Sequence, residues 1–146
     1  MKLTSVTADL QAKVFFDLDG VICVDPPVNF HVGTLDYETF LLTAEPLGLI
    51  RGHVDGIVTG RTEKYRSVTL KWLQRYGILF DEIHFKPEHL AGVDKTPAYK
   101  AQIYKKSDAG LFVESSKWQA EKIAAISHKP VFSIEDCKMY AVYQRI

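Results

Sequence analysis

Two carboxylates stand two positions apart in the segment Asp17-Leu18-Asp19-Gly20, directly after a short apolar run at residues 14–16. Side chains two positions apart point the same way in an extended chain, so both acids are expected to face one pocket. Carboxylates that lie so close repel each other unless a cation or a proton lies between them. Hard oxygen ligands suit Mg²⁺, which also attracts phosphate oxygens. The motif indicates either a magnesium-assisted phosphate site or a solvated turn, and the other strand ends must decide between them.

A second polar cluster follows the apolar run 56–58, where Thr59, Gly60 and Arg61 precede the segment with the clearest helical spacing. The free amides of a helix N-terminus bind anions, and a threonine hydroxyl there either caps the helix or binds a phosphate. Arg61 is either a surface cation or a guanidinium at the pocket edge that holds a substrate oxygen. We therefore treat these three residues as candidate substrate ligands.

The fourth apolar run has lysines before it and an acid after it. Lys95 and Lys100 lie in the segment that leads into this run, and Glu114 follows it. Lysines are normally solvated, but a lysine on a crossover helix is placed to reach a phosphoryl group. Glu114 is placed to complete a Mg²⁺ shell with Asp17 and the backbone carbonyl of Asp19. This third acid at a strand end favours the phosphate-site interpretation of the first motif.

The elements that must position these residues alternate along the chain, because short apolar runs are separated mostly by segments with helical spacing. Such alternation predicts parallel strands joined by right-handed helical crossovers. The predicted strands contain residues 14–16, 56–58, 82–85, 111–113 and 130–134, and the predicted helices cover 36–47, 62–76, 96–106 and 115–127. We expect an α/β fold, a three-layer α/β/α Rossmann-like sandwich with a mainly parallel five-stranded sheet. Such sheets bind ligands at the carboxyl ends of their strands.

Length and composition indicate one soluble globular domain over residues 1–146. Of the 146 residues, 47% are hydrophobic and 25% are charged, which allows one buried core. Lys plus Arg and Asp plus Glu number 18 each, so no global field favours nucleic acid or an anionic membrane. No apolar run has the length of a membrane span or of a signal-peptide core. We expect a cytoplasmic protein with no membrane partner.

Four aromatic residues fall at helical spacings, and they are Tyr37, Trp72, Tyr76 and Trp118. Aromatic side chains at such spacings pack into a core more often than they form a platform on which bases stack. We therefore assign all four to the core and expect none of them in the site.

The four sites, in this order, resemble the motifs of the haloacid dehalogenase superfamily. The segment Phe15-Phe16-Asp17-Leu18-Asp19-Gly20-Val21 is similar to its first motif and Ile57-Val58-Thr59-Gly60-Arg61 to its second, and the match covers most of the chain. The resemblance implies a hydrolase, a Mg²⁺-dependent phosphatase that forms an aspartyl-phosphate. In the roles it implies, Asp17 is the nucleophile, Asp19 the general acid and then base, Thr59 a phosphate ligand, Lys100 the charge-stabilising lysine, and Asp17, Asp19 and Glu114 the metal ligands. A carboxylate nucleophile divides hydrolysis into formation and breakdown of the acyl-phosphate.

The fourth motif departs from the family pattern. Glu-Ser-Ser-Lys-Trp-Gln stands where a pair of aspartates is usual, which leaves Gln119 near the place of the second acid. The change either weakens or alters metal binding, or preserves it through an amide that holds a metal-bound water. For the third motif, the segment Lys100-Ala-Gln-Ile-Tyr104 is similar to the family's lysine-bearing helix, and Lys95 stays the alternative.

The spacing of the motifs leaves no room for a full cap domain, because the intervals from Asp17 to Thr59 and from Thr59 to Lys100 are each shorter than an ordinary domain. The resemblance therefore implies the capless subgroup, with a short flap-like segment at about residues 21–33. Open sites of this kind act on phosphate carried by large substrates or are covered by a partner subunit, so a homodimer is one expectation.

Two functions compete. The first is hydrolysis of a phosphomonoester, and the substrate is a nucleotide, a sugar phosphate or the phosphorylated end of a nucleic acid. The second is a catalytically silent phosphate-binding or regulatory module that keeps the fold, which the altered fourth motif favours. The intact Asp17, Asp19 and Thr59 favour the enzyme.

Overall fold

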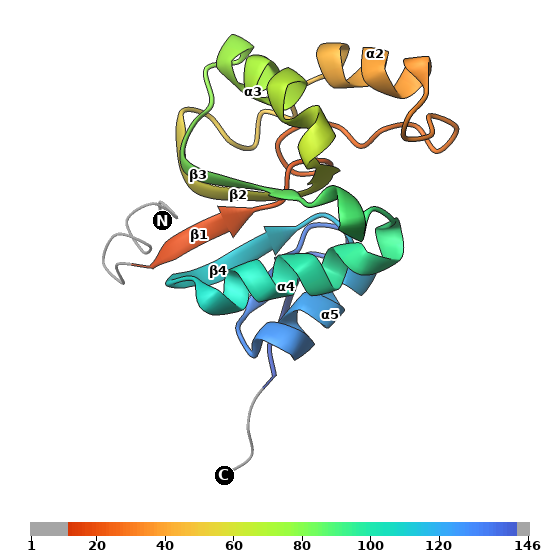
Figure 1. The fold of residues 1–146 in the computed structure, drawn as a ribbon. Coiled ribbons are helices and arrows are strands. Elements are labelled where there is room, and N and C mark those ends of the chain that lie inside the picture. The colour runs from red at the N-terminus through yellow and green to blue at the C-terminus, as the bar shows by residue number, and fades with distance from the viewer. Residues whose placement is uncertain (1–11, 143–146) are drawn as a thin grey trace.

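The computed structural model describes residues 12–142 as a twisted six-stranded sheet with helices on both faces (Figure 1). The strands are β1 (Lys13–Phe16), β2 (His53–Thr62), β3 (Leu79–Lys86), β4 (Ala109–Glu114), β5 (Val131–Ser133) and β6 (Lys138–Tyr140). The helices are α2 (Leu35–Thr43), α3 (Arg66–Arg75), α4 (Thr96–Lys106) and α5 (Lys117–Ser127), with single 3-10 turns η1 (Glu63–Tyr65), η2 (Glu88–Leu90) and η3 (Val93–Lys95). The sheet order is β3-β2-β1-β4-β5-β6, and only the β5–β6 pair is antiparallel.

Two hydrophobic clusters hold the layers together, one on each face of the sheet. Helices α2 and α3 cover one face, and α4 and α5 cover the other (Figure 1). Leu41 and Leu73 belong to the first cluster, and Tyr104 and Ile123 to the second. Each such buried side chain stabilises the fold by roughly 1.5–3 kcal/mol. The predicted α/β sandwich is confirmed, and no helix within residues 12–142 is long and apolar enough to cross a membrane.

The predicted number of strands was wrong, because the sheet has a sixth strand, β6. It follows a tight turn in which Cys137 has a φ of 52°, and it pairs antiparallel to β5. Its sequence Lys-Met-Tyr is short and its side chains are mostly solvent-exposed. An edge strand with one covered face needs no apolar run, so the pattern that predicted the other strands does not detect this one.

The helix predicted at 62–76 begins later than expected. β2 continues through Thr62, η1 follows, and α3 then begins at Arg66. The helix predicted at 36–47 ends at Thr43, because the backbone of the next residues pairs elsewhere. Val24 N–H donates to the carbonyl of Glu45 and Leu47 N–H donates to that of Ile22.

The order of the strands places a topological switch point at β1. From β1 the chain passes to β2 and β3 on one side, and it returns to form β4 on the other side. In open α/β sheets ligands bind in the crevice at the carboxyl ends of the two strands on either side of such a reversal. A site is therefore expected where β1 and β4 end.

The segment predicted as a flap, residues 21–33, divides into two parts. Val21, Ile22 and Cys23 are buried in the core, and the backbone N–H groups of all three donate to the carbonyl of Leu18. Residues 25–33 form the exposed part, in which only Pro26 and Phe30 are half-buried. The exposed part therefore begins about four residues after the start of the predicted segment.

Candidate functional site

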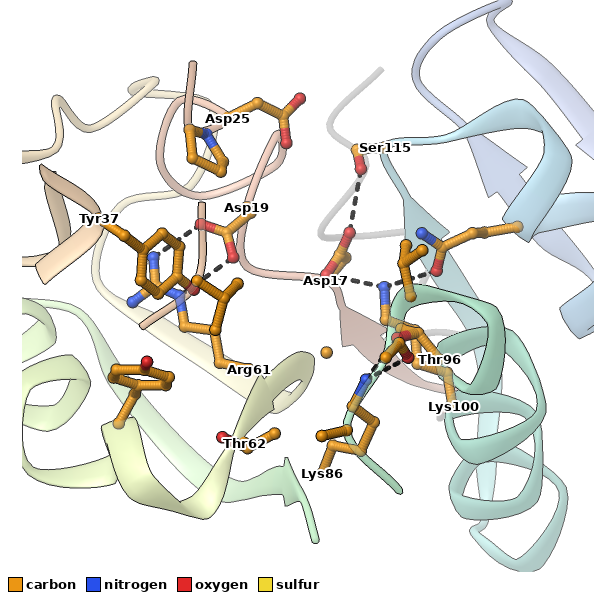
Figure 2. A pocket seen from close by; sticks show the side chains of 18 of the residues that line it. Asp17, Asp19, Asp25, Tyr37, Arg61, Thr62, Lys86, Thr96, Lys100 and Ser115 are labelled. Carbon is orange, nitrogen blue, oxygen red and sulfur yellow. Dashed lines mark hydrogen bonds and ion pairs between the residues drawn. The ribbon is translucent and has the colours of Figure 1, made fainter. Parts of the chain in front are cut away.

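A pocket of about 350 Å³ lies at the carboxyl ends of β1, β2, β3 and β4, where the switch point predicts it (Figure 2). Six acidic or basic side chains line it and come from separate parts of the chain: Asp17, Asp19, Asp25, Arg61, Lys86 and Lys100. Three acids and three cations thus line one cavity. Such clustering is a property of functional sites, because mutual charges are needed to hold ionised groups in a partly desolvated place.

Asp17 is held in one orientation at the end of β1. Its Oδ1 accepts a hydrogen bond from Leu18 N–H at 2.8 Å and lies 3.1 Å from Lys100 Nζ. Its Oδ2 accepts a hydrogen bond from Ser115 Oγ at 3.0 Å. The backbone N–H of Asp17 donates to Val113 in β4, which ties the residue to the switch point. The carboxylate is therefore fixed and turned to the pocket (Figure 2).

Lys100 lies between Asp17 and Glu114 and reaches both from the first half of α4. Its Nζ lies 3.0 Å from Glu114 Oε2 and 3.2 Å from Gln119 Oε1. Burial opposes its charge, but Asp17 and Glu114 outweigh burial and raise the pKa of Lys100 above its ordinary value. Lys95, the alternative lysine, is exposed and does not line the pocket. Of the two predicted lysines, the structure places only Lys100 beside Asp17.

Glu114 is completely buried and does not line the pocket, although it lies near Asp17. Burial, followed by the negative charge of Asp17, raises the pKa of Glu114, and Lys100 opposes this shift. Neighbouring residues of a strand point to opposite faces, so the next residue, Ser115, reaches the pocket instead. Ser115 Oγ lies 3.5 Å from Glu114 Oε1 and binds Asp17. The strand end thus presents a hydroxyl to the pocket where the sequence predicts a carboxylate.

Arg61 is a buried partner of Asp19 and is not a surface cation. Its Nε donates to Asp19 Oδ2 at 3.0 Å and its Nη2 to Asp19 Oδ1 at 2.7 Å. Nη1 donates to Thr69 Oγ1 of α3 at 3.0 Å, which fixes the guanidinium from behind. Burial opposes its charge, but Asp19 outweighs burial and raises the pKa of Arg61. Both carboxylate oxygens of Asp19 are therefore turned toward Arg61 (Figure 2).

Thr59 lies completely buried inside β2, and its Oγ1 accepts a hydrogen bond from Arg61 N–H at 3.1 Å. It does not line the pocket, whereas Gly60, Arg61 and Thr62 do. Gly60 allows the close approach of α4 to β2, since a Cβ there would lie 2.7 Å from Thr96 Cγ2. Because the strand continues to Thr62, no helix N-terminus follows Thr59 directly.

Lys86 is a site residue that the sequence analysis missed. It ends β3, and its Nζ donates to the carbonyl of Gly92 and to Thr96 Oγ1, each at 2.8 Å. Burial, followed by the charge of Lys100, lowers the pKa of Lys86. Within residues 12–142 it forms no ion pair with a carboxylate. The rule that strand ends carry function points to this residue, since Lys86 directly follows the third predicted strand.

Asp25 is the second missed residue, and it lies in the exposed part of the flap segment. Burial raises its pKa, and the charges of Asp19 and then Asp17 raise it further. It lies close to Gly20, which has a φ of +82°, because a Cβ on Gly20 would be 2.7 Å from Asp25 Oδ2 and 2.6 Å from Ser115 Cβ. The motif glycine therefore lets Asp25 and Ser115 approach each other beside Asp17.

The three acids predicted to bind a metal, Asp17, Asp19 and Glu114, do not bring three side-chain ligand atoms within 4.8 Å of one another. Within residues 12–142, one set of three ligand-type side chains has its ligand atoms within 4.8 Å of one another: His53, Asp55 and Asp81. That set lies at the start of β2 and β3, at the edge of the sheet opposite the pocket, and His53 is bonded to Asp81 at 2.7 Å. Arg61 binds Asp19, and Lys100 lies within 3.1 Å of both Asp17 and Glu114.

Comparison with known proteins gives no match to a family model, a curated protein or a solved structure.

Proposed function

We propose that this chain is a Mg²⁺-dependent phosphomonoester hydrolase in which Asp17 accepts the phosphoryl group, as its resemblance to capless haloacid dehalogenase phosphatases implies. The observation that carries the proposal is the placement of Asp17. Its carboxylate is fixed by Leu18 N–H, Ser115 and Lys100 at the wall of a pocket that also holds Lys86. A fixed nucleophile among cations is the arrangement that phosphoryl transfer needs, since its catalysis is mostly positioning and charge stabilisation.

The chemistry divides into two steps on the chain's own residues. In the first, a carboxylate oxygen of Asp17 attacks phosphorus, the bond to the ester oxygen breaks, and Asp19 donates a proton to the leaving oxygen. In the second, Asp19 takes a proton from water, which attacks phosphorus and releases phosphate and free Asp17. Lys86 and Lys100 stabilise the negative charge on the transferring oxygens. Asp19 must release at least one hydrogen bond from Arg61 to take part, so Arg61 governs its position.

Oxygen atoms in the pocket fit a magnesium ion, although the set differs from the one predicted. Asp17 and the backbone carbonyl of Asp19 remain candidate ligands, and Asp25, Ser115 and Gln119 line the same space. The raised pKa of Asp25 reflects burial and repulsion from Asp19 and Asp17, and a divalent cation would relieve the repulsion. Glu114 contributes through Lys100 and not as a direct ligand. When bound, the ion would neutralise phosphoryl oxygens and act as a Lewis acid.

Hydrolysis of p-nitrophenyl phosphate tests the proposal. The wild type is expected to hydrolyse it with Mg²⁺ and to lose this activity when the metal is chelated. Asp17→Asn keeps the shape of the side chain and removes the nucleophilic charge, so it should lose at least roughly a thousandfold in kcat, in the range seen for nucleophile variants. Asp36→Asn, on the exposed start of α2, is the control and should keep full activity. Equal activity of Asp17→Asn and wild type would refute the assignment.

A second candidate function, the silent phosphate-binding module, is favoured by one observation. Neutral Ser115 and Gln119 line the pocket beyond β4, while Glu114 is fully engaged by Lys100. A module of this kind binds inorganic phosphate measurably by calorimetry but turns over no member of a phosphoester panel. Binding with turnover favours the enzyme.

A further inference from the structure

The outer part of the pocket carries exposed apolar side chains beside Asp25, whereas the cations lie on its floor. Two segments far apart in the sequence contribute to it: residues 25–33 and the loop between β3 and α4. Val32 on the first segment is 68% exposed and Val93 on the second is 69% exposed, yet both line the same cavity. Exposed apolar side chains scattered singly need no explanation, but a pair at the mouth of one charged pocket marks a surface for a ligand.

Two packed aromatic side chains form a wall of the same pocket as Val32 and Val93, the two residues that we call its rim. The rings of Tyr37 and Tyr65 meet edge to face with centroids 5.3 Å apart and an angle of 76°. Both residues are buried and both line the pocket, as does the half-buried Phe30. A ligand that reaches past the phosphoryl position therefore meets aromatic and aliphatic carbon from several sides.

The cations of the pocket all lie on its floor. Arg61, Lys86 and Lys100 are buried, and no other cation is among the lining residues in the described part of the chain. A nucleic-acid strand needs cations that follow its backbone away from the reacting phosphate. A sugar phosphate would place hydroxyl groups against Val32 and Val93, whose side chains offer them no hydrogen bond. Val32 and Val93 therefore favour neither a nucleic-acid strand nor a sugar phosphate as the substrate.

We propose, on the basis of the function proposed above, that the substrate is a small phosphomonoester whose alcohol part is an aromatic or aliphatic group held between Val32 and Val93. The phosphoryl group lies on the floor between Asp17 and Lys86. A pocket of about 350 Å³ is at the lower end of the range for small-molecule sites, which suits a compact group of this kind. Each methylene buried at the rim raises affinity about fourfold.

Phosphonates separate binding from turnover, because their carbon–phosphorus bond is not hydrolysed. Benzylphosphonate, methylphosphonate and 2-hydroxyethylphosphonate are titrated by calorimetry into wild type and into Asp17→Asn. Benzylphosphonate is expected to bind at least roughly tenfold more tightly than the other two. Val93→Asn should reduce this ratio about fivefold or more. Leu79→Asn, at a position 64% exposed on β3 and outside the pocket, should leave the ratio unchanged.

The outcomes separate the two proposals. Equal affinities for the three phosphonates, or a preference for the hydroxyethyl compound, overturn the apolar-substrate inference even if p-nitrophenyl phosphate is hydrolysed. An intact benzyl preference in Val93→Asn overturns it as well. A preference for benzylphosphonate that depends on Val93 supports the inference. If that preference is seen but no phosphoester is hydrolysed, the proposed hydrolase activity fails and the inferred binding of an apolar group stands.

Discussion

Lys100 and Glu114 form a buried ion pair, with Lys100 Nζ 3.0 Å from Glu114 Oε2 and both side chains almost fully removed from solvent. Asp17 is the second anion of Lys100, at 3.1 Å. The pair joins α4 to the end of β4, so the lysine beside the proposed nucleophile is also a structural link. Removal of either partner leaves a charge in a place where water does not reach it, which is far more destabilising than the loss of an exposed pair.

Lys100→Ala is therefore expected to lower the free energy of unfolding by about 3–5 kcal/mol. Lys95→Ala is the matched control on the exposed turn before α4 and should stay within about 0.5 kcal/mol of wild type. Urea denaturation followed by circular dichroism measures both. The double variant Lys100→Met/Glu114→Leu should recover part of the loss, because it removes both buried charges. Equal effects of Lys95→Ala and Lys100→Ala would contradict the assigned placement of the lysine.

Gly20→Ala should be strongly destabilising for two reasons, which are backbone strain and steric overlap. Gly77→Ala has only the first of these effects, so comparing the two variants separates them. Gly20 and Gly77 both have positive φ, +82° and +68°. Alanine is therefore strained at each by roughly 1–2 kcal/mol. At Gly20 the new Cβ would also lie 2.6 Å from Ser115 Cβ, whereas nothing lies within 4 Å at Gly77. Gly20→Ala should therefore cost at least about 1 kcal/mol more than Gly77→Ala, since overpacking adds this much or more. Equal losses in thermal or urea denaturation would show that Asp25 and Ser115 do not press on Gly20.

Phosphate binding should weaken at high pH through Lys86. Because burial and then the charge of Lys100 lower the pKa of Lys86 below the 10.5 of a free lysine, its charge is lost as pH rises through the lowered value. Phosphate affinity, measured by calorimetry between about pH 7 and pH 10, should fall over that range. In Lys86→Arg the cation keeps its charge, so the fall should be smaller. Lys95→Arg should reproduce the wild-type profile, and an unchanged profile in Lys86→Arg would exclude Lys86 as the titrating group.

Arg61→Lys should impair turnover more than folding. A lysine replaces the two-pronged contact with Asp19 by a single point charge and loses the hydrogen bond to Thr69. Misplacement of a catalytic group by about an ångström lowers rate up to a hundredfold, so we expect kcat for p-nitrophenyl phosphate to fall roughly tenfold to a hundredfold. Arg66→Lys changes an exposed arginine paired with Glu63 and is the control. If the two variants had equal kcat, the orientation of Asp19 by Arg61 would have no part in catalysis.

The sequence predicted which elements would form, because apolar periodicity is a local property of the chain. It also predicted that the carboxyl ends of the strands would meet, because neighbouring strands of a parallel sheet run in the same direction. Asp17 was selected for this reason, whereas Lys100 was preferred to Lys95 because its segment resembles the lysine-bearing helix of the haloacid dehalogenase superfamily. The same pattern did not predict that Ser115, and not Glu114, lines the pocket. A shift of one residue in a strand exchanges the two faces, and the pattern of apolar residues does not fix a strand end to a single residue.

Tertiary packing explains the other differences. Thr59 was expected at a helix start, but pairing of β2 with β3 extends to Thr62 and encloses Thr59 in the sheet. Trp118 was assigned to the core, yet it is 43% exposed, because the face of α5 that packs inward is filled by smaller side chains such as Ala120 and Ala124. Tyr37 was expected only to pack, and it both packs and lines the pocket. Helical spacing predicts a buried stripe and does not predict where that stripe reaches a cavity.

The most direct test of the account is detection of a phosphoryl group on Asp17 during turnover. The protein is mixed with p-nitrophenyl phosphate and Mg²⁺, quenched in acid within the first turnover, digested and analysed by mass spectrometry. The account predicts a peptide that contains Asp17 with the mass of one added phosphoryl group, and no such peptide from Asp17→Asn. Steady-state hydrolysis with an unmodified Asp17 peptide at every quench time, or a phosphoryl group on another residue, would contradict it.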